Sequence, residues 1–187
     1  MTIGIDEVGR GCWAGPLVVG AVALKTDIVG LTDSKRLSKQ ERSRLAELIQ
    51  NNAYVGLGWV SNAEIDDIGL SSALRLAAER ATADFPLERT SQIIIDGNQN
   101  FLPGVTGVIT AVKADLDYPC VSAASIVAKV ARDEYMAEQA ARYPGFGFER
   151  HVGYGTKHHL EALLIHGVTP LHRTSFAPIR KLLEGKL

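Results

Sequence analysis

MTIGIDEVGRG, at Met1–Gly11, opens the chain and predicts a short apolar β-strand that ends in a Gly-Arg-Gly turn. The strand carries two adjacent carboxylates, Asp6 and Glu7. Neighbouring side chains of a strand point to opposite faces, so at most one of the two can lie on a fully solvated face. A carboxylate near a core is costly unless a cation or hydrogen-bond donors meet it. The two acids are therefore either solvated side chains at the end of a strand or one part of a site whose other carboxylates lie elsewhere in the chain.

The composition favours one compact α/β domain. The chain has 187 residues, of which 46% are hydrophobic and 22% charged. No apolar run is long enough to span a membrane and no signal peptide opens the chain, so we expect a cytoplasmic protein. Cys12 and Cys120 are far apart and form no CxxC pair, so neither a disulfide framework nor a zinc site is indicated.

The charge is unevenly distributed. Residues 142–187 hold seven Lys and Arg against three Glu, together with all five histidines, although the whole chain has a net charge of −1. An acidic body with a basic C-terminal segment suits a protein that binds both cations and a polyanion. A solvated basic surface is the alternative.

The first half of the chain predicts two further strands and three helices. Pro16–Leu24 is a nearly continuous apolar run, which predicts a strand buried on both faces and paired with the first strand as a hairpin. The other expected elements are a helix from the capping box at Ser38–Glu41 to about Gln50, a strand at Tyr54–Val60, a short helix after the capping box at Ser61–Glu64, and a core-facing helix at Leu70–Ala83.

The second half repeats the theme of the opening stretch. Gln92–Asp96 predicts an apolar strand that ends in Asp-Gly, and Val108–Val112 predicts another strand that leads into an acidic element containing Asp115. Val121–Arg142 predicts a long helix, whose first residues are small enough to pack tightly on the sheet. Ligands of open α/β sheets bind beyond the strand ends, so these acids are candidates for one site.

Four carboxylates thus follow strands that are distant in sequence: Asp6, Glu7, Asp96 and Asp115. If they converge, they raise one another's pKa unless cations neutralise them. Hard oxygen ligands suit Mg²⁺ or Mn²⁺, and two such ions roughly 3.5–4 Å apart are a device for phosphodiester hydrolysis. The spacing alone leaves open that the four acids are scattered turn residues.

Six stretches, in order, resemble the motif set of ribonuclease HII, the type 2 ribonuclease H family. They are IDEVGRGCWAGPLVVGAV, TDSKRLS, IIIDGN, VKADLDYPCVSAASIVAKVARD, HVGYGT and HRTSFAP. The resemblance implies a ribonuclease H-like fold, which is a mixed five-stranded sheet flanked by helices with a small helical C-terminal part. It also implies an endonuclease that cleaves the RNA of RNA/DNA hybrids and cuts 5′ to a single ribonucleotide in duplex DNA, leaving 3′-hydroxyl and 5′-phosphate ends.

The resemblance also assigns roles to residues. It places Asp6, Glu7, Asp96 and Asp115 on the family's catalytic and metal-binding carboxylates, with two Mg²⁺ or Mn²⁺ ions expected. It places Gly9, Arg10 and Gly11 on the motif that reads the RNA–DNA junction, and Tyr154 on the tyrosine that packs against the following deoxyribose. Lys35, Lys157 and Arg173 are candidate phosphate contacts. Asp117 falls outside the pattern and is expected to be a solvated loop acid.

Five residues depart from the family pattern: Cys12, Trp13, Ala114, Leu116 and Gly155. The first two stand where Pro-Leu is common, and they are expected to alter the packing of the loop. Ala114 and Leu116 replace a glycine and a serine around Asp115, which puts the local backbone in question. Gly155 replaces a proline, so Tyr154 is expected to be held less rigidly.

We divide the chain into a catalytic core at residues 1–142 and a helical basic segment at residues 143–187 that completes the substrate groove within a single domain. The expected partners are RNA/DNA hybrids and ribonucleotide-containing DNA, no protein partner is indicated, and a monomer is expected. A metal-dependent phosphohydrolase of small nucleotides and a catalytically silent hybrid-binding module remain alternatives.

Overall fold

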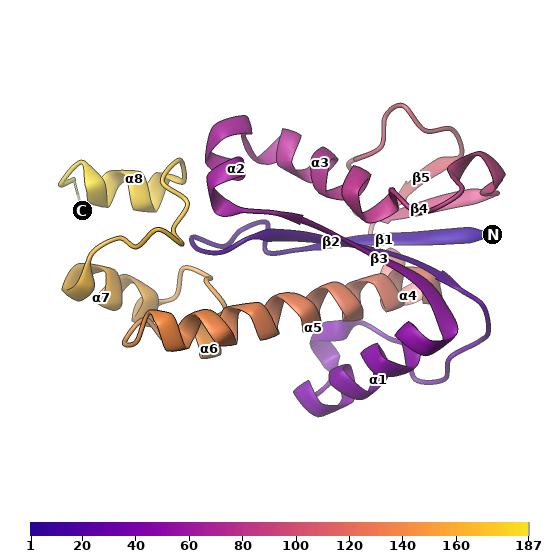
Figure 1. Ribbon diagram of the computed structural model, residues 1–187, viewed down its shortest axis with the longest axis horizontal. Helices are drawn as coiled ribbons and strands as arrows, with labels where there is room; N and C mark the ends of the chain where they lie inside the picture. The colour runs from indigo at the N-terminus through magenta and orange to yellow at the C-terminus, as the bar shows by residue number, and fades with distance from the viewer. Residues whose placement is uncertain (187) are drawn as a thin grey trace.

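The fold is organised by one mixed sheet of five strands in the order β3-β2-β1-β4-β5 (Figure 1). The computed structural model describes residues 1–186, apart from the side chains of Lys35 and Arg89. The strands are β1 (Thr2–Val8), β2 (Leu17–Leu24), β3 (Ala53–Val60), β4 (Gln92–Asp96) and β5 (Val108–Ala111). β2 runs antiparallel to β1 and β3, whereas β1, β4 and β5 are parallel. The five-stranded mixed sheet expected from the sequence is confirmed.

The hairpin of β1 and β2 forms the centre of this sheet. Asp6 pairs with Gly20 and Glu7 with Val19 in its register. All residues of β2 except Leu24 are buried, as the continuous apolar run predicted, because helices cover both faces of the sheet.

Helices form a layer on each side of the sheet (Figure 1). α2 (Asn62–Ile68) and α3 (Leu70–Thr82) lie on one side, and α1 (Lys39–Asn52), α4 (Ala114–Asp117) and α5 (Pro119–Arg142) lie on the other. Both predicted capping boxes are present, with Ser38 and Glu41 at α1 and Ser61 and Glu64 at α2. Two short 3-10 turns, Ser34–Arg36 and Leu87–Arg89, lie in connecting segments.

The start of α5 packs on the central hairpin without room for side chains on the strand below. A Cβ at Gly4 would lie 2.2 Å from the carbonyl carbon of Cys120, and one at Gly20 would lie 2.5 Å from the carbonyl oxygen of Ala124. Ala123 and Ala124 are fully buried there. The small residues predicted to allow tight packing therefore do so, and the long helix is placed directly beside the strand that carries Asp6.

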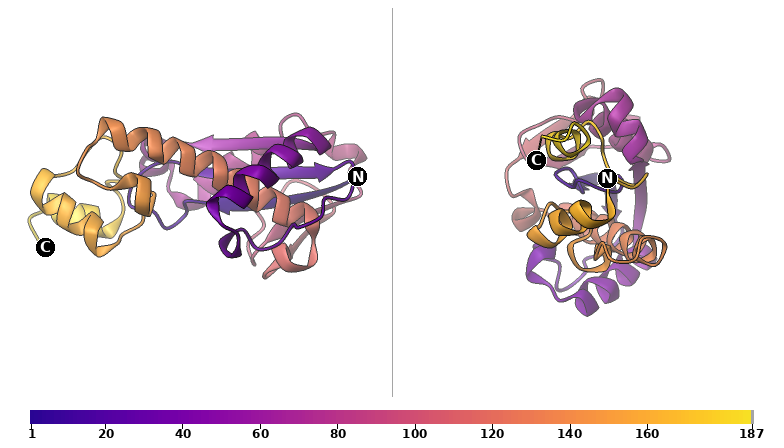
Figure 2. Two further views of the ribbon diagram at one scale, coloured as in Figure 1. Left: turned by 90° about the horizontal axis from the view of Figure 1, so that it is seen from below. Right: turned by 90° about the vertical axis from the view of Figure 1, so that its left-hand side faces the viewer.

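The C-terminal part extends from one end of the sheet (Figure 2). It contains α6 (Phe148–His151), α7 (Lys157–His166) and α8 (Ala177–Leu183), which share a small core with the end of α5. Among residues 1–186, no helix combines the length and apolarity that crossing a membrane requires.

The structure differs from the expectation after β5. The strand ends at Ala111, and Lys113 adopts a left-handed conformation with φ 61° at the start of α4. Asp117 is exposed as expected, but it lies in this short helix and not in a loop. The long helix begins at Pro119, two residues before the predicted start, because proline fits the first turn of a helix.

Candidate active site

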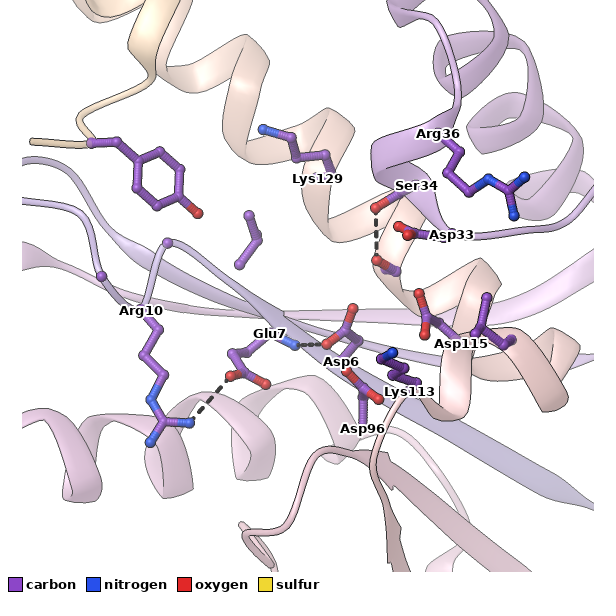
Figure 3. Close-up of a pocket in the computed structure, with 16 residues that line it drawn as sticks. Asp6, Glu7, Arg10, Asp33, Ser34, Arg36, Asp96, Lys113, Asp115 and Lys129 are labelled. Atoms are coloured by element: carbon purple, nitrogen blue, oxygen red, sulfur yellow. Dashed lines mark hydrogen bonds and ion pairs between the residues drawn. The ribbon is translucent and has the colours of Figure 1, made fainter. Parts of the chain in front are cut away.

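The four predicted carboxylates line one pocket. Asp6 and Glu7 come from β1 and Asp96 ends the adjacent parallel strand β4. Asp115 lies in the first turn of α4. In Figure 3, Asp6 lies beside Asp96 and Lys113, with Glu7 and Asp115 on either side. The pocket has a volume of about 720 Å³, and it opens where β1 and β4 end.

Asp6 lies half-buried on β1, and its surroundings disfavour the charged carboxylate. Burial raises its pKa to about 7, a hydrogen bond from Ser125 opposes this rise, and the charges of Glu7 and Asp96 add to it. The backbone N–H of Glu7 donates to Asp6 Oδ1 at 2.8 Å. Because burial and two neighbouring acids disfavour the charged form of Asp6, a bound cation would stabilise it.

The carboxylate of Glu7 contacts the guanidinium of Arg10. Burial raises its pKa, and Arg10, whose Nη1 lies 3.4 Å from Glu7 Oε1, lowers it. Arg10 Nη2 also donates to Gln99 Oε1 at 3.1 Å. The two bonds hold the half-exposed Arg10 side chain at one side of the pocket, beside Glu7 (Figure 3).

Asp96 ties the strand end to α4. Its Oδ1 accepts a hydrogen bond from the backbone N–H of Ala114 at 2.8 Å. Lys113, and not Ala114, has the positive φ of this turn, and Ala114 is buried inside α4. The replacement of a glycine at position 114 therefore causes no backbone strain. Leu116 is exposed and lines the pocket near Asp115.

The Gly9–Arg10–Gly11 turn and Tyr154 form the side of the pocket nearest the C-terminal part. Gly9 has φ 88°, and a Cβ there would lie 2.2 Å from Arg132 Nε, so only glycine fits. A Cβ at Gly11 would have no atom within 4 Å, which leaves its backbone open to the pocket. Tyr154 follows a turn in which Val152 and Gly153 both have positive φ, and its side chain is 41% exposed.

Of the three predicted phosphate contacts, Lys157 and Arg173 do not line this pocket. The side chain of Lys35 lies outside the described residues. Lys157 is 90% exposed at the start of α7, away from the pocket lining, where it faces Glu161 at 3.6 Å. Arg173 is fully buried, and its guanidinium donates to the carbonyls of Gly15 and Arg10. The residue predicted as a phosphate contact therefore lies in the interior, and it is not among the residues that line the pocket.

The pocket lining also contains polar residues that the sequence did not single out. They are Asp33, Ser34, Arg36, Lys113, Ser125 and Lys129. Ser34 Oγ and Ser125 Oγ lie 2.9 Å apart and join the loop before α1 to α5. Lys129 Nζ contacts Asp133 Oδ1 at 2.8 Å. The polar Thr-Asp-Ser-Lys-Arg stretch was the available signal for the first of these segments, but only Lys35 was selected from it.

The donors of the pocket fit a hard divalent cation. All four acids offer oxygen, which suits Mg²⁺ or Mn²⁺ better than softer metals. In the described part of the chain, no three Asp, Glu, His or Cys side chains could hold a metal ion as they stand. The fit therefore rests on the chemistry of the donors and on the raised pKa of Asp6, whose charged form a cation would stabilise.

Comparison with known proteins gives a consistent result. The family model described as ribonuclease HII matches residues 3–179. Ribonuclease HII of Thermus thermophilus is 46% identical over 182 residues, which are 96% of this chain and 87% of that protein.

Two solved structures have the same fold. The ribonuclease HII of Archaeoglobus fulgidus, solved in a complex with PCNA, aligns with a TM-score of 0.80 and 27% identity over 96% of this chain and 97% of that one. Ribonuclease H2 of Pyrococcus horikoshii gives a TM-score of 0.79 and 28% identity over 99% and 98% of the two chains. The ribonuclease H-like architecture expected from the motifs is therefore confirmed.

Proposed function

The chain belongs to the ribonuclease HII family, and on that premise we propose that it incises duplex DNA 5′ to a single embedded ribonucleotide. As a member of this family it is a metal-dependent ribonuclease of the type 2 ribonuclease H class, which acts on RNA/DNA hybrids.

One observation carries the proposal: the four carboxylates share a pocket with the Gly9–Gly11 turn and Tyr154. A nuclease that recognises one ribonucleotide needs its hydrolytic groups within one nucleotide of the group that detects the 2′-hydroxyl. Glycine backbone at the turn permits close approach to a sugar, and the aromatic ring of Tyr154 offers a flat apolar face for the next one.

Asp6, Glu7, Asp96 and Asp115 are proposed to hold two divalent ions, Mg²⁺ or Mn²⁺. When bound, such ions supply an activated water and stabilise the leaving oxygen of the phosphodiester. Asp6 and Asp115 come from different elements that face the same pocket, so together they would hold the ions between β1 and α4. Glu7 and Asp96 complete the set, and the products carry 3′-hydroxyl and 5′-phosphate ends.

Cationic side chains around the acids are suited to hold the nucleic-acid backbone. Arg10, Arg36, Lys113 and Lys129 line the same pocket. Because phosphate contacts fix position without reading sequence, these residues would place the scissile phosphate over the carboxylates. Residues 143–187 contribute Tyr154 to the pocket lining, which supports the proposal that this segment completes the groove.

The proposal is tested with three labelled substrates under Mg²⁺, Mn²⁺ or chelator: a DNA duplex with one ribonucleotide, a continuous RNA/DNA hybrid and free nucleotides. We expect metal-dependent cleavage of both duplexes. Cleavage of the continuous hybrid alone would refute the junction-reading proposal. Preferred hydrolysis of free nucleotides, or binding without any cleavage, would refute the proposed substrate or activity.

A further inference from the structure

Arg173 supports the Gly9–Arg10–Gly11 turn from inside the protein. Its Nε donates to the carbonyl of Gly15 at 3.0 Å and its Nη1 to the carbonyl of Arg10 at 3.1 Å. Among the described residues, the buried Nη2 has no hydrogen-bond partner. The guanidinium thus donates to the carbonyls of this loop, and the position of the Arg10 carbonyl depends directly on it.

Backbone pairing reinforces this contact. Ala14 and His172 form an isolated antiparallel bridge. The N–H of Gly15 donates to the carbonyl of Leu171 at 2.9 Å, and the N–H of Arg173 donates to the carbonyl of Trp13 at 2.8 Å. The residues after the turn are therefore fixed against the same C-terminal stretch that carries Arg173.

His172, the preceding residue, is connected to Tyr154. His159 Nδ1 lies 2.9 Å from the carbonyl oxygen of Tyr154, which can only accept, so Nδ1 carries the proton and Nε2 is the acceptor. His172 Nδ1 lies 3.0 Å from the N–H of Thr169 and 3.3 Å from the carbonyl oxygen of Thr169; the shorter contact makes Nδ1 the acceptor and places the proton on Nε2. The two Nε2 atoms are 3.0 Å apart, and the tautomers inferred from this network make His172 the donor to His159.

The segment that carries both residues is itself anchored to the body of the protein. Asp66 of α2 accepts hydrogen bonds from the backbone N–H groups of Thr174 at 2.7 Å and Ser175 at 3.0 Å. Asn62 Nδ2, also from α2, donates to the carbonyl of Pro170 at 2.8 Å. Residues 170–175 are thus fixed at both ends, with His172 and Arg173 between the anchors.

We propose that His172 and Arg173 are positioning residues that fix the Gly9–Arg10–Gly11 turn relative to Tyr154. The turn comes from the N-terminal hairpin and Tyr154 from the C-terminal part, so a substrate that contacts both requires a fixed distance between them. One dipeptide reaches both: Arg173 through the carbonyl of Arg10, and His172 through His159 to the carbonyl of Tyr154. The inference rests on the proposed function, because the distance between the turn and Tyr154 matters only if both contact one substrate.

The test uses two variants. Arg173→Lys keeps the charge but loses the guanidinium that donates to two carbonyls. His172→Phe keeps a ring beside Phe146 and Phe148 but loses the Nε2–H that donates to His159. Ile179→Val is the matched control, since Ile179 is fully buried in the same C-terminal core and forms no side-chain hydrogen bond. Steady-state cleavage is measured on the single-ribonucleotide duplex and on the continuous hybrid.

We expect both positioning variants to lose about tenfold or more in kcat/KM on the single-ribonucleotide duplex. The loss on the hybrid is expected to be smaller, because every position of its RNA strand offers a 2′-hydroxyl that a displaced Gly9–Arg10–Gly11 turn can still contact. The control variant should keep the ratio of the two activities. Equal losses on the two substrates, or no loss on either, would overturn the inference.

Amide hydrogen exchange tests the positioning without cleavage. Arg173→Lys is expected to speed exchange at Trp13 and Gly15, and His172→Phe at Thr156, whose N–H donates to the carbonyl of Tyr154. Unchanged exchange at these amides would overturn the positioning role. If exchange changes as expected but the unsubstituted protein does not cut at a single ribonucleotide, the proposed function fails and the positioning role does not.

Discussion

The indole of Trp13 occupies the space that a side chain at position 155 would need. A Cβ built on Gly155 would lie 2.0 Å from Trp13 Cε2 and 2.2 Å from Trp13 Cζ2. The same ring lies 5.5 Å from the ring of His159, measured between centroids. Trp13 and Gly155, two departures from the family pattern, therefore depend on each other, because the tryptophan fits only where the residue after Tyr154 has no side chain.

Gly155→Ala is expected to destabilise the protein by about 1–3 kcal/mol, since the added methyl group overpacks the contact with Trp13. In a Trp13→Leu background the same substitution is expected to cost less, because the indole is gone. Urea unfolding of the two single variants and the double variant measures this coupling. Additive free energies would show that the two positions are independent.

Asp115→Asn is expected to abolish turnover and to leave hybrid binding nearly unchanged, because the amide keeps the shape of the side chain but weakens a proposed metal ligand. Asp117→Asn is the matched control, since Asp117 lies in the same short helix with its side chain exposed. Cleavage and hybrid affinity are measured side by side. Retained activity in Asp115→Asn would remove Asp115 from the site.

Tyr154→Ala is expected to reduce incision at a single ribonucleotide more than cleavage of a continuous hybrid, because the ring supports one specific sugar. Tyr154→Phe keeps the ring and should retain most of the selectivity. Tyr54→Ala, at an exposed position on β3, serves as the surface control. A similar loss on both substrates would indicate that Tyr154 only supports the loop.

The contribution of the buried histidines to stability is expected to fall as the pH decreases from about 6.5 to about 4, whereas Asp6, whose pKa burial raises to about 7, changes stability in the opposite direction over the same range. Burial lowers the pKa of His159 and of His172 to about 4 each. The ring of His151 stacks on His159, and His158 contacts His151, so both are further titratable groups near this pair. At the buried histidines the unfolded chain takes up protons at a higher pH than the folded one, so their contribution is greatest above the unfolded pKa and declines by up to about 1.4 kcal/mol per pH unit for each histidine.

Urea unfolding across this pH range measures the slope. A His159→Phe/His172→Phe variant is expected to lose less stability on acidification than the unsubstituted protein, since the titrating pair is gone while Asp6 and Glu7 remain. If the two proteins share one slope, the buried histidines are not neutral in the folded state.

The sequence predicted the elements and the carboxylate pocket well because both depend on local signals. Capping boxes and apolar runs are short-range patterns, and strand-end acids meet wherever neighbouring strands end together. The sequence did not predict that Arg173 is buried, because arginine is usually solvated and its partners are carbonyls more than 150 positions away in the chain. The contacts between His159 and His172 and between Trp13 and Gly155 were also missed, because no local pattern of the sequence indicates them and only the folded chain brings these residues together.

The proposed function is tested most directly by mapping the cut on a DNA duplex that carries one ribonucleotide, in Mg²⁺ and in chelator. We predict a single metal-dependent incision immediately 5′ to the ribonucleotide, with a 3′-hydroxyl that a polymerase can extend, and its loss in Asp115→Asn but not in Asp117→Asn. Incision at another position, incision in the presence of chelator, or an intact duplex would contradict it.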